Sequence, residues 1–218
     1  MSVNGPPNQL FRFRTWPMAG KNHTLELLEE GAFYCSCPRE FDDPHDSQLG
    51  AQATGSQFDI DRWIHIDMEG IPEIMQKYEL SRGVCLCFDA QHEFFQKAKP
   101  VLYTHSPVYV EYAVDSEATV DQMAYCKSLA WQFQKEWRIV FPGDEPKKVR
   151  FPKQTLLAVI LGYRFPMLQF DRLKQILLNG GYTIEALRAE RVPRSYELRL
   201  INLGHVGATE KPNYCHSK

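Results

Sequence analysis

The stretch of residues 131–141, WQFQKEWRIVF, holds the side chains best suited to chemistry. Its aromatic and β-branched content predicts a strand, and alternation along that strand points Gln134 and Glu136 to one face, with Arg138 beside them. There Glu136 would hold a ligand hydroxyl or stabilise a cation, and the Gln134 amide would orient the ligand through both of its ends. Both are candidate catalytic residues. The alternative is a solvent-facing edge, on which a Glu–Arg pair contributes less than ~1 kcal/mol.

Two arginines share one face of a second predicted strand. In residues 10–14, LFRFR, two phenylalanines alternate with Arg12 and Arg14, as expected of a half-buried strand. Arginines spaced in this way grip a phosphate or carboxylate bidentately, or they form a solvated face. Arg12, Arg14 and Arg138 are therefore candidate ligand-binding residues.

An acidic turn is the third candidate site. The sequence FDDPHD places Asp42, Asp43, His45 and Asp46 within five residues, enough oxygen and nitrogen ligands for Mg²⁺ or Mn²⁺. Such clusters more often form turns in which the side chains cap their own backbone. We favour the turn, and we do not expect a resident metal here.

The cysteines allow a zinc hypothesis as well. The two C-x-C pairs, YCSC and VCLC, would each place both sulfurs on one face of a strand, and two neighbouring strands of this kind could surround a zinc ion. The interpretation we favour is that these cysteines are small hydrophobic residues on core strands. The six cysteines are Cys35, Cys37, Cys85, Cys87, Cys126 and Cys215.

The elements that must position these residues are mostly strands. Helices are predicted from Asn22 to Gly31, over 116–130 and over 168–178, whereas residues 47–70 read as a mobile segment or an irregular insertion. Because the order is not a regular β-α-β alternation, we predict an α+β domain with a mixed, mostly antiparallel and possibly split sheet and a few flanking helices. It would span 10–204, between flexible tails at 1–9 and 205–218. The strands are predicted over 10–14, 32–37, 83–88, 101–112, 131–141, 156–162, 182–187 and 196–201.

Length and charge narrow the function classes. The chain has 218 residues and a net charge of −2, so we expect one domain without a global basic field for nucleic acid or an anionic membrane. A nucleic-acid contact would need a local patch. The apolar runs fall short of the ~20 residues that span a bilayer, and the first residues do not resemble an export signal. We expect a soluble, cytoplasmic protein.

The order of the motifs resembles the bacterial domain of unknown function 2971 family. The resemblance rests on LFRFR, LEEGAFYCSCPREFDDPHD, RGVCLCFD, the W-x-x-Q-K-E-W-R stretch and LLAVILG followed by a helix, and it covers roughly residues 10–200. The chain departs from the family pattern at Asp42, Ser81 and Gln134, where the family has Asn, His and Glu, and in a reduced W-x-H-Y element. The resemblance implies a role in phage defence, by analogy with some relatives, and these departures imply altered or absent activity.

The motif order is also similar, as an analogy at fold level, to ADP-ribosyltransferases. That analogy implies NAD as the cofactor. Arg12 would bind the pyrophosphate or the nicotinamide ribose, and Ser36 would hold the ribose. Glu136 would stabilise the oxocarbenium as nicotinamide leaves, with Gln134 aligning the acceptor.

Two other hypotheses remain open. One is a metal-dependent phosphodiesterase built on Asp43, His45, Asp46 and Glu136. The other is a non-catalytic sensor whose arginine face holds a nucleotide or another small phosphorylated ligand.

Overall fold

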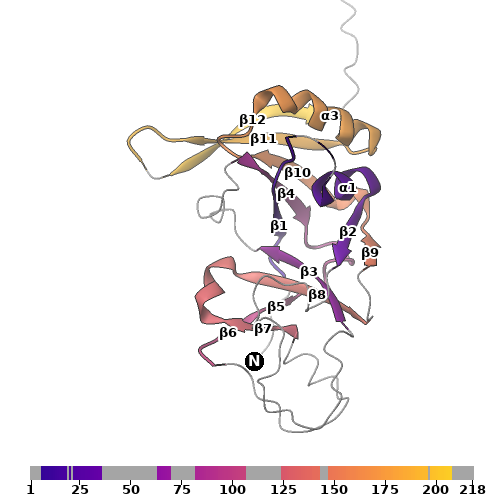
Figure 1. The fold of residues 1–218 in the computed structure, drawn as a ribbon, viewed down its shortest axis with the longest axis vertical. Coiled ribbons are helices and arrows are strands. Elements are labelled where there is room, and N and C mark those ends of the chain that lie inside the picture. The colour runs from indigo at the N-terminus through magenta and orange to yellow at the C-terminus, as the bar shows by residue number, and fades with distance from the viewer. Residues whose placement is uncertain are drawn as a thin grey trace, which may run out of the picture.

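An eight-stranded sheet runs through the chain (Figure 1). The computed structural model describes residues 6–18, 20, 22–35, 63–69, 82–106, 124–142, 147–195 and 197–207. The strand order is β12-β11-β10-β4-β1-β3-β8-β5, and every neighbouring pair is antiparallel except β10–β11. The elements are β1 (Gln9–Arg14), α1 (His23–Glu30), β2 (Ala32–Cys35), β3 (Trp63–Glu69), β4 (Val84–Asp89), β5 (Lys99–Pro100), β6 (Leu102–Thr104), β7 (Cys126–Ser128), η5 (Leu129–Gln134), β8 (Glu136–Pro142), β9 (Lys147–Arg150), η6 (Lys153–Thr155), β10 (Leu156–Leu161), η7 (Met167–Gln169), α3 (Phe170–Asn179), β11 (Ile184–Arg191) and β12 (Leu198–Val206).

The predicted α+β class is confirmed. Two small sheets stand beside the large one, an antiparallel pair β2–β9 and a parallel pair β6–β7. Helix α1 begins where predicted, because the Asn22 side chain accepts hydrogen bonds from the backbone N–H groups of Thr24 and Leu25 at 3.0 and 3.1 Å. It ends at Gly31, whose φ of 65° is one that glycine adopts without strain.

The prediction of a helix over 116–130 is wrong for residues 126–130. Cys126–Ser128 form strand β7, which pairs in parallel with β6, and Leu129 opens the short 3₁₀ helix η5. The Ser128 hydroxyl accepts a hydrogen bond from the N–H of Ala130 at 3.4 Å and so begins η5. Strand pairing and a serine cap therefore override helix propensity here. Residues 116–123 lie outside the described residues.

The strand predicted over 131–141 is also only partly correct. Residues Leu129–Gln134 form η5, and Lys135 turns the chain with φ 45° before β8 begins at Glu136. A 3₁₀ turn joined to a left-handed residue breaks the alternation on which the prediction depended.

Residues 47–70, predicted as a mobile segment or an irregular insertion, contain a strand. Strand β3, Trp63–Glu69, lies between β1 and β8 and pairs with β8 along its whole length. Its sequence WIHIDME alternates apolar and polar residues from Ile64 onward, which is the signal that could have revealed it.

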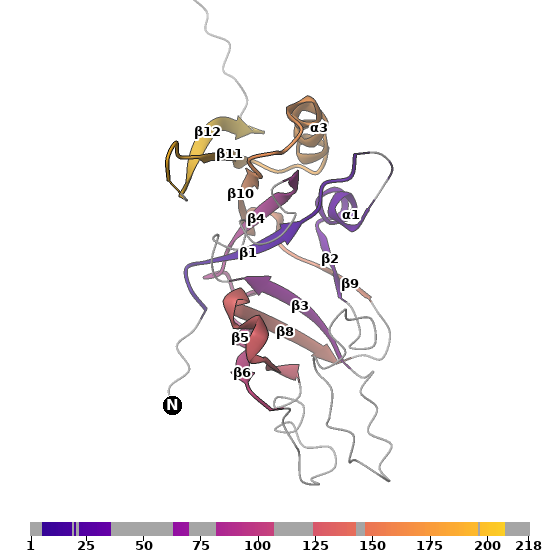
Figure 2. The same cartoon turned by 60° about the vertical axis from the view of Figure 1, so that its left-hand side comes forward.

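The large sheet buries side chains on both faces. One face, which we call the main core, packs against α1, α3 and β2, which lie on one side of the sheet in Figure 2. The second core lies on the other face and consists of Phe11, Phe13, Cys85, Cys87, Ala158, Ile160 and Ala189.

The three described cysteines of the C-x-C pairs are buried on core strands, as favoured. Cys35 belongs to the main core, whereas Cys85 and Cys87 belong to the second core, on the opposite face. The sheet therefore separates the two pairs at these positions. Cys37 lies outside the described residues, and no group of three or more potential metal-ligating His, Cys, Asp or Glu side chains occurs in the described part of the chain.

The described residues include 6–9 and 205–207, which the prediction placed in the two tails. Pro6 is buried, and the carbonyl of Asn8 accepts a hydrogen bond from the N–H of Ala90 at 3.1 Å. At the other end β12 continues through His205 to Val206, which pairs with Ile184 and is buried. Backbone pairing thus extends the fold beyond residue 204.

Candidate functional site

The strand register decides which candidate residues share a face. Phe11 of β1 is the Cα partner of Glu69 in β3, and Glu69 is the partner of Glu136 in β8. Residues in one such row belong to the same face of a sheet, so Glu136 lies on the face of Phe11. Arg138 lies two residues further along β8 on the same face. The intervening Trp137 lies on the other face and packs against the main core.

Arg12 and Arg14 therefore lie on the opposite face from Glu136. Both are half-buried, and they share the main-core face of the sheet with Leu10 of the same strand. The sheet itself separates them from Glu136, and they do not form one cleft with it. The arginine face expected from Arg12, Arg14 and Arg138 is thus divided between two faces.

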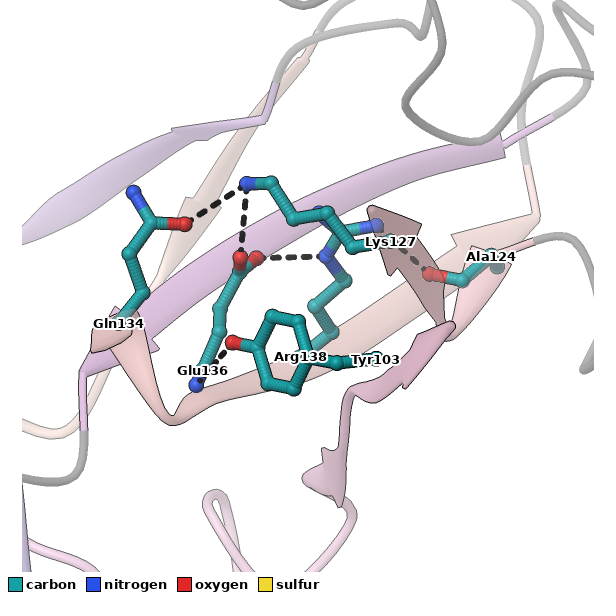
Figure 3. Close-up of polar contacts among 6 residues, drawn as sticks. All are labelled: Tyr103, Ala124, Lys127, Gln134, Glu136 and Arg138. Atoms are coloured by element: carbon teal, nitrogen blue, oxygen red, sulfur yellow. Dashed lines mark hydrogen bonds and ion pairs between the residues drawn. The ribbon is translucent and has the colours of Figure 1, made fainter. Parts of the chain in front are cut away.

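Glu136 is the centre of a polar cluster at the β8 end of the sheet (Figure 3). We call Tyr103, Lys127, Gln134, Glu136 and Arg138 the Glu136 cluster. The Glu136 side chain is only 3% exposed, and cations contact both of its carboxylate oxygens. A buried carboxylate needs such partners, because its desolvation otherwise costs several kcal/mol.

Arg138 supplies the first of these cations from the same strand. Its guanidinium is fully buried, and Nε donates to Glu136 Oε1 at 2.6 Å. Nη1 donates to the carbonyl oxygen of Ala124 at 2.8 Å, so Arg138 also holds the chain just before β7. The guanidinium therefore links β8 to the neighbouring β6–β7 pair.

Lys127 supplies the second cation, from β7. Its ammonium donates to Glu136 Oε2 at 3.0 Å and to Gln134 Oε1 at 2.9 Å, and the side chain is 10% exposed. The ammonium also lies 5.3 Å from the centre of the Trp131 ring. Lys127 thus stands at the border between the buried network and the surface.

Tyr103 completes the cluster from β6. It is the Cα partner of Lys127 in the parallel β6–β7 pair, and its hydroxyl oxygen accepts a hydrogen bond from the backbone N–H of Glu136 at 2.8 Å. Burial raises the pKa of Tyr103 to about 12, and the adjacent negative charge of Glu136 also raises it. The phenol therefore stays neutral at physiological pH.

The local backbone explains why Gln134 and Glu136 meet. Lys135 has a left-handed conformation, so that the end of η5 folds back and both side chains reach the Lys127 ammonium. The expectation that these residues act together agrees with this geometry, although strand alternation is not the cause. Of the predicted site residues, Gln134, Glu136 and Arg138 come together. The predicted positions outside the described residues are Ser36, Asp42, Asp43, His45 and Asp46.

Lys127 and Tyr103 are residues of the cluster that the sequence does not predict as site residues. Lys127 falls within the predicted helix 116–130, and nothing in its spacing marks it as a partner of Glu136. Tyr103 falls within the predicted strand 101–112, with no predicted role. The side chains of W-x-x-Q-x-E-x-R nevertheless gather here, because Trp131, Gln134 and Glu136 all contact the Lys127 ammonium and Arg138 contacts Glu136.

Comparison of the chain with models of protein families, with curated proteins and with solved structures found no match. The resemblance to the domain of unknown function 2971 family therefore stays a prediction. Within the described residues, no helix is both long enough and apolar enough to cross a membrane.

Proposed function

We propose that the Glu136 cluster is the ligand site of a non-catalytic binding module, which takes a nucleotide or another small phosphorylated ligand. The observation that supports this most directly is the placement of Lys127. Its ammonium is held at 2.9 and 3.0 Å by Gln134 and Glu136, at the edge of a buried network, with part of the side chain exposed. A lysine fixed in this way is a preorganised partner for a phosphate group.

The environment of Glu136 favours binding over turnover. Both of its oxygens are occupied by Arg138 and Lys127, and the side chain is 3% exposed. A carboxylate that stabilises a reacting cation must reach the reacting atoms. In the proposed site Glu136 instead positions Lys127. Gln134, where the family has Glu, fits the same role.

The ligand class follows from the mixture of groups. Two cationic side chains converge on one carboxylate, and the neutral phenol of Tyr103 adjoins them. Of these groups the Lys127 ammonium is the most exposed, and a nucleotide offers it phosphate oxygens, with ribose hydroxyls for the neighbouring Gln134 amide. Such ligands are abundant in the cytoplasm, which is where we propose that the protein acts.

Thermal denaturation in the presence of ligands tests the proposal. We expect ADP, ADP-ribose or NAD at a hundredfold excess over Kd to raise Tm by roughly 5 °C, because a ligand that binds only the folded state stabilises it. Lys127→Met should remove this shift. Lys148→Met is the matched control, since Lys148 forms an exposed pair with Glu30. If none of the three compounds, inorganic phosphate or pyrophosphate shifts Tm at millimolar concentration, the proposal is wrong.

A second candidate is an ADP-ribosyltransferase-like effector in phage defence, in which another residue would take the NAD-binding role that the analogy gives Arg12, because Arg12 lies on the face opposite Glu136. The observation that favours it is the meeting of Gln134 and Glu136, the two residues that correspond to [E/Q]-x-E, at one ammonium. It predicts that the parent protein releases nicotinamide from labelled NAD and that Glu136→Gln does not. Saturable binding of NAD without nicotinamide release would reject this candidate and leave the binding module.

A further inference from the structure

The turn beside the Glu136 cluster carries two large aromatic rings. Trp131 and Phe133 of η5 lie with their ring centres 6.0 Å apart and their planes at 35°. None of the six residues of η5 is buried, and both rings are partly exposed. Neighbouring aromatic rings left at a surface in this way commonly mark a contact site, because they offer large apolar area at low entropic cost.

These rings are joined to the cluster through Lys127. The ammonium that contacts Gln134 and Glu136 also lies 5.3 Å from the centre of the Trp131 ring. Lys135, with φ 45°, connects η5 directly to β8. The aromatic pair therefore lies directly beside the charged groups of the Glu136 cluster.

We infer that Trp131 and Phe133 form the platform for the base of a nucleotide whose phosphate lies at the Lys127 ammonium. This inference rests on the proposed function and narrows its ligand class. Bases stack on aromatic rings with little preference for sequence, because every base has a π face. A sugar phosphate or inorganic phosphate would contact the ammonium and make no stacking contact with the two rings.

Titration calorimetry with AMP, UMP and ribose 5-phosphate tests the inference, because the two nucleotides differ from the sugar phosphate in the base. AMP and UMP should each bind at least about tenfold more tightly than ribose 5-phosphate, the contribution expected of one stacked base. Trp131→Leu should weaken AMP and UMP binding by about tenfold and leave the Kd of ribose 5-phosphate within twofold. AMP should also quench tryptophan fluorescence in the parent protein and quench it less in Trp131→Leu.

The controls separate the inference from the proposed function. Tyr163→Leu removes another partly exposed ring, whose centre lies 4.6 Å from Cζ of Arg191. This variant should change none of the three affinities. Phe133→Leu, expected to weaken AMP binding severalfold, replaces Trp131→Leu if that variant does not fold. Equal affinities for AMP and ribose 5-phosphate in the parent protein overturn the inference and leave the proposed function. If neither compound binds, the proposed function fails, and the inference fails with it.

Discussion

Two regions of one sheet face bury side chains at alternate strand positions, with opposite chemistry. On β4, Cys85 and Cys87 lie in the second core among apolar neighbours. On β8, Glu136 and Arg138 occupy equivalent positions and are buried to the same extent. The difference is in what covers them. The thiols need only contact, whereas the charges need oriented partners, which β6, β7 and the carbonyl of Ala124 supply.

Of the changes that test this comparison, removal of Arg138 should lower the free energy of unfolding most. Arg138→Met takes one partner from Glu136 and leaves the carbonyl of Ala124 without its hydrogen bond, so we expect a loss of about 3–5 kcal/mol in the free energy of unfolding. Urea denaturation followed by circular dichroism measures it. Glu136→Gln/Arg138→Met is the double variant that isolates the pair. A loss below ~1 kcal/mol in Arg138→Met would mean that the cluster contributes no more than a surface ion pair.

A polar group placed in the second core should cost less, but measurably. Cys87→Ser puts a hydroxyl into a site that is 4% exposed, with an expected loss of about 1–3 kcal/mol. Cys87→Ala is the control for the lost volume, and the difference between the two variants, from the same urea experiment, gives the polar contribution. Equal stability of the two variants would show that this face tolerates polar groups without special partners.

Loss of the Tyr103 hydroxyl should have a smaller effect. Tyr103→Phe leaves the backbone N–H of Glu136 without its acceptor, which we expect to cost about 1–2 kcal/mol. Tyr163→Phe, at the edge of the second core, is the control for loss of a hydroxyl outside the cluster. Unchanged stability of Tyr103→Phe would mean that water replaces the hydroxyl and that the cluster is open on that side.

The smallest expected effect is the late ionisation of two buried tyrosines in an alkaline titration. Burial raises the pKa of Tyr103 and of Tyr182 to about 12. Among the described residues, at least these two tyrosines should therefore stay protonated in the folded protein after ordinary tyrosines ionise near pH 10. Absorbance at 295 nm measures this, and Tyr103→Phe and Tyr182→Phe should each remove one late proton. Because both pKa values are higher in the folded than in the unfolded state, the folded state holds these two protons more tightly. The resulting contribution to the free energy of unfolding is complete below pH 10 and is lost as the pH rises toward 12. Ionisation of all tyrosines near pH 10 in the folded protein would contradict the burial.

The sequence was a good guide where one strand or one cap decides the structure. The alternation in residues 10–14 placed Arg12 and Arg14 on one face, and Asn22 and Gly31 marked the ends of α1. It could not give the relation between Arg12 and Glu136, because that depends on β3, a strand that lies between theirs in space. Which face each residue occupies is set by the number and register of strands across the sheet.

The partners of Glu136 were hidden for a related reason. Lys127 reaches it only because β7 pairs in parallel with β6, so that Tyr103 and Lys127, far apart in the sequence, become neighbours. The left-handed turn at Lys135 was equally invisible, since lysine has no preference for that conformation. The site residues on β8 could therefore be predicted from the sequence. Their partners on β6 and β7 could not.

The short strand β5 has a consequence for how copies of the chain can associate. It forms one edge of the large sheet with only two residues, and its second residue is Pro100, which has no backbone N–H to offer to another strand. The other edge, β12, is nine residues long and carries a 49%-exposed Leu200. If copies paired through the edges of this sheet, they would therefore pair through β12. Two copies joined in this way leave no second β12 edge open, so the pairing would end at a closed pair and would not continue to a fibre.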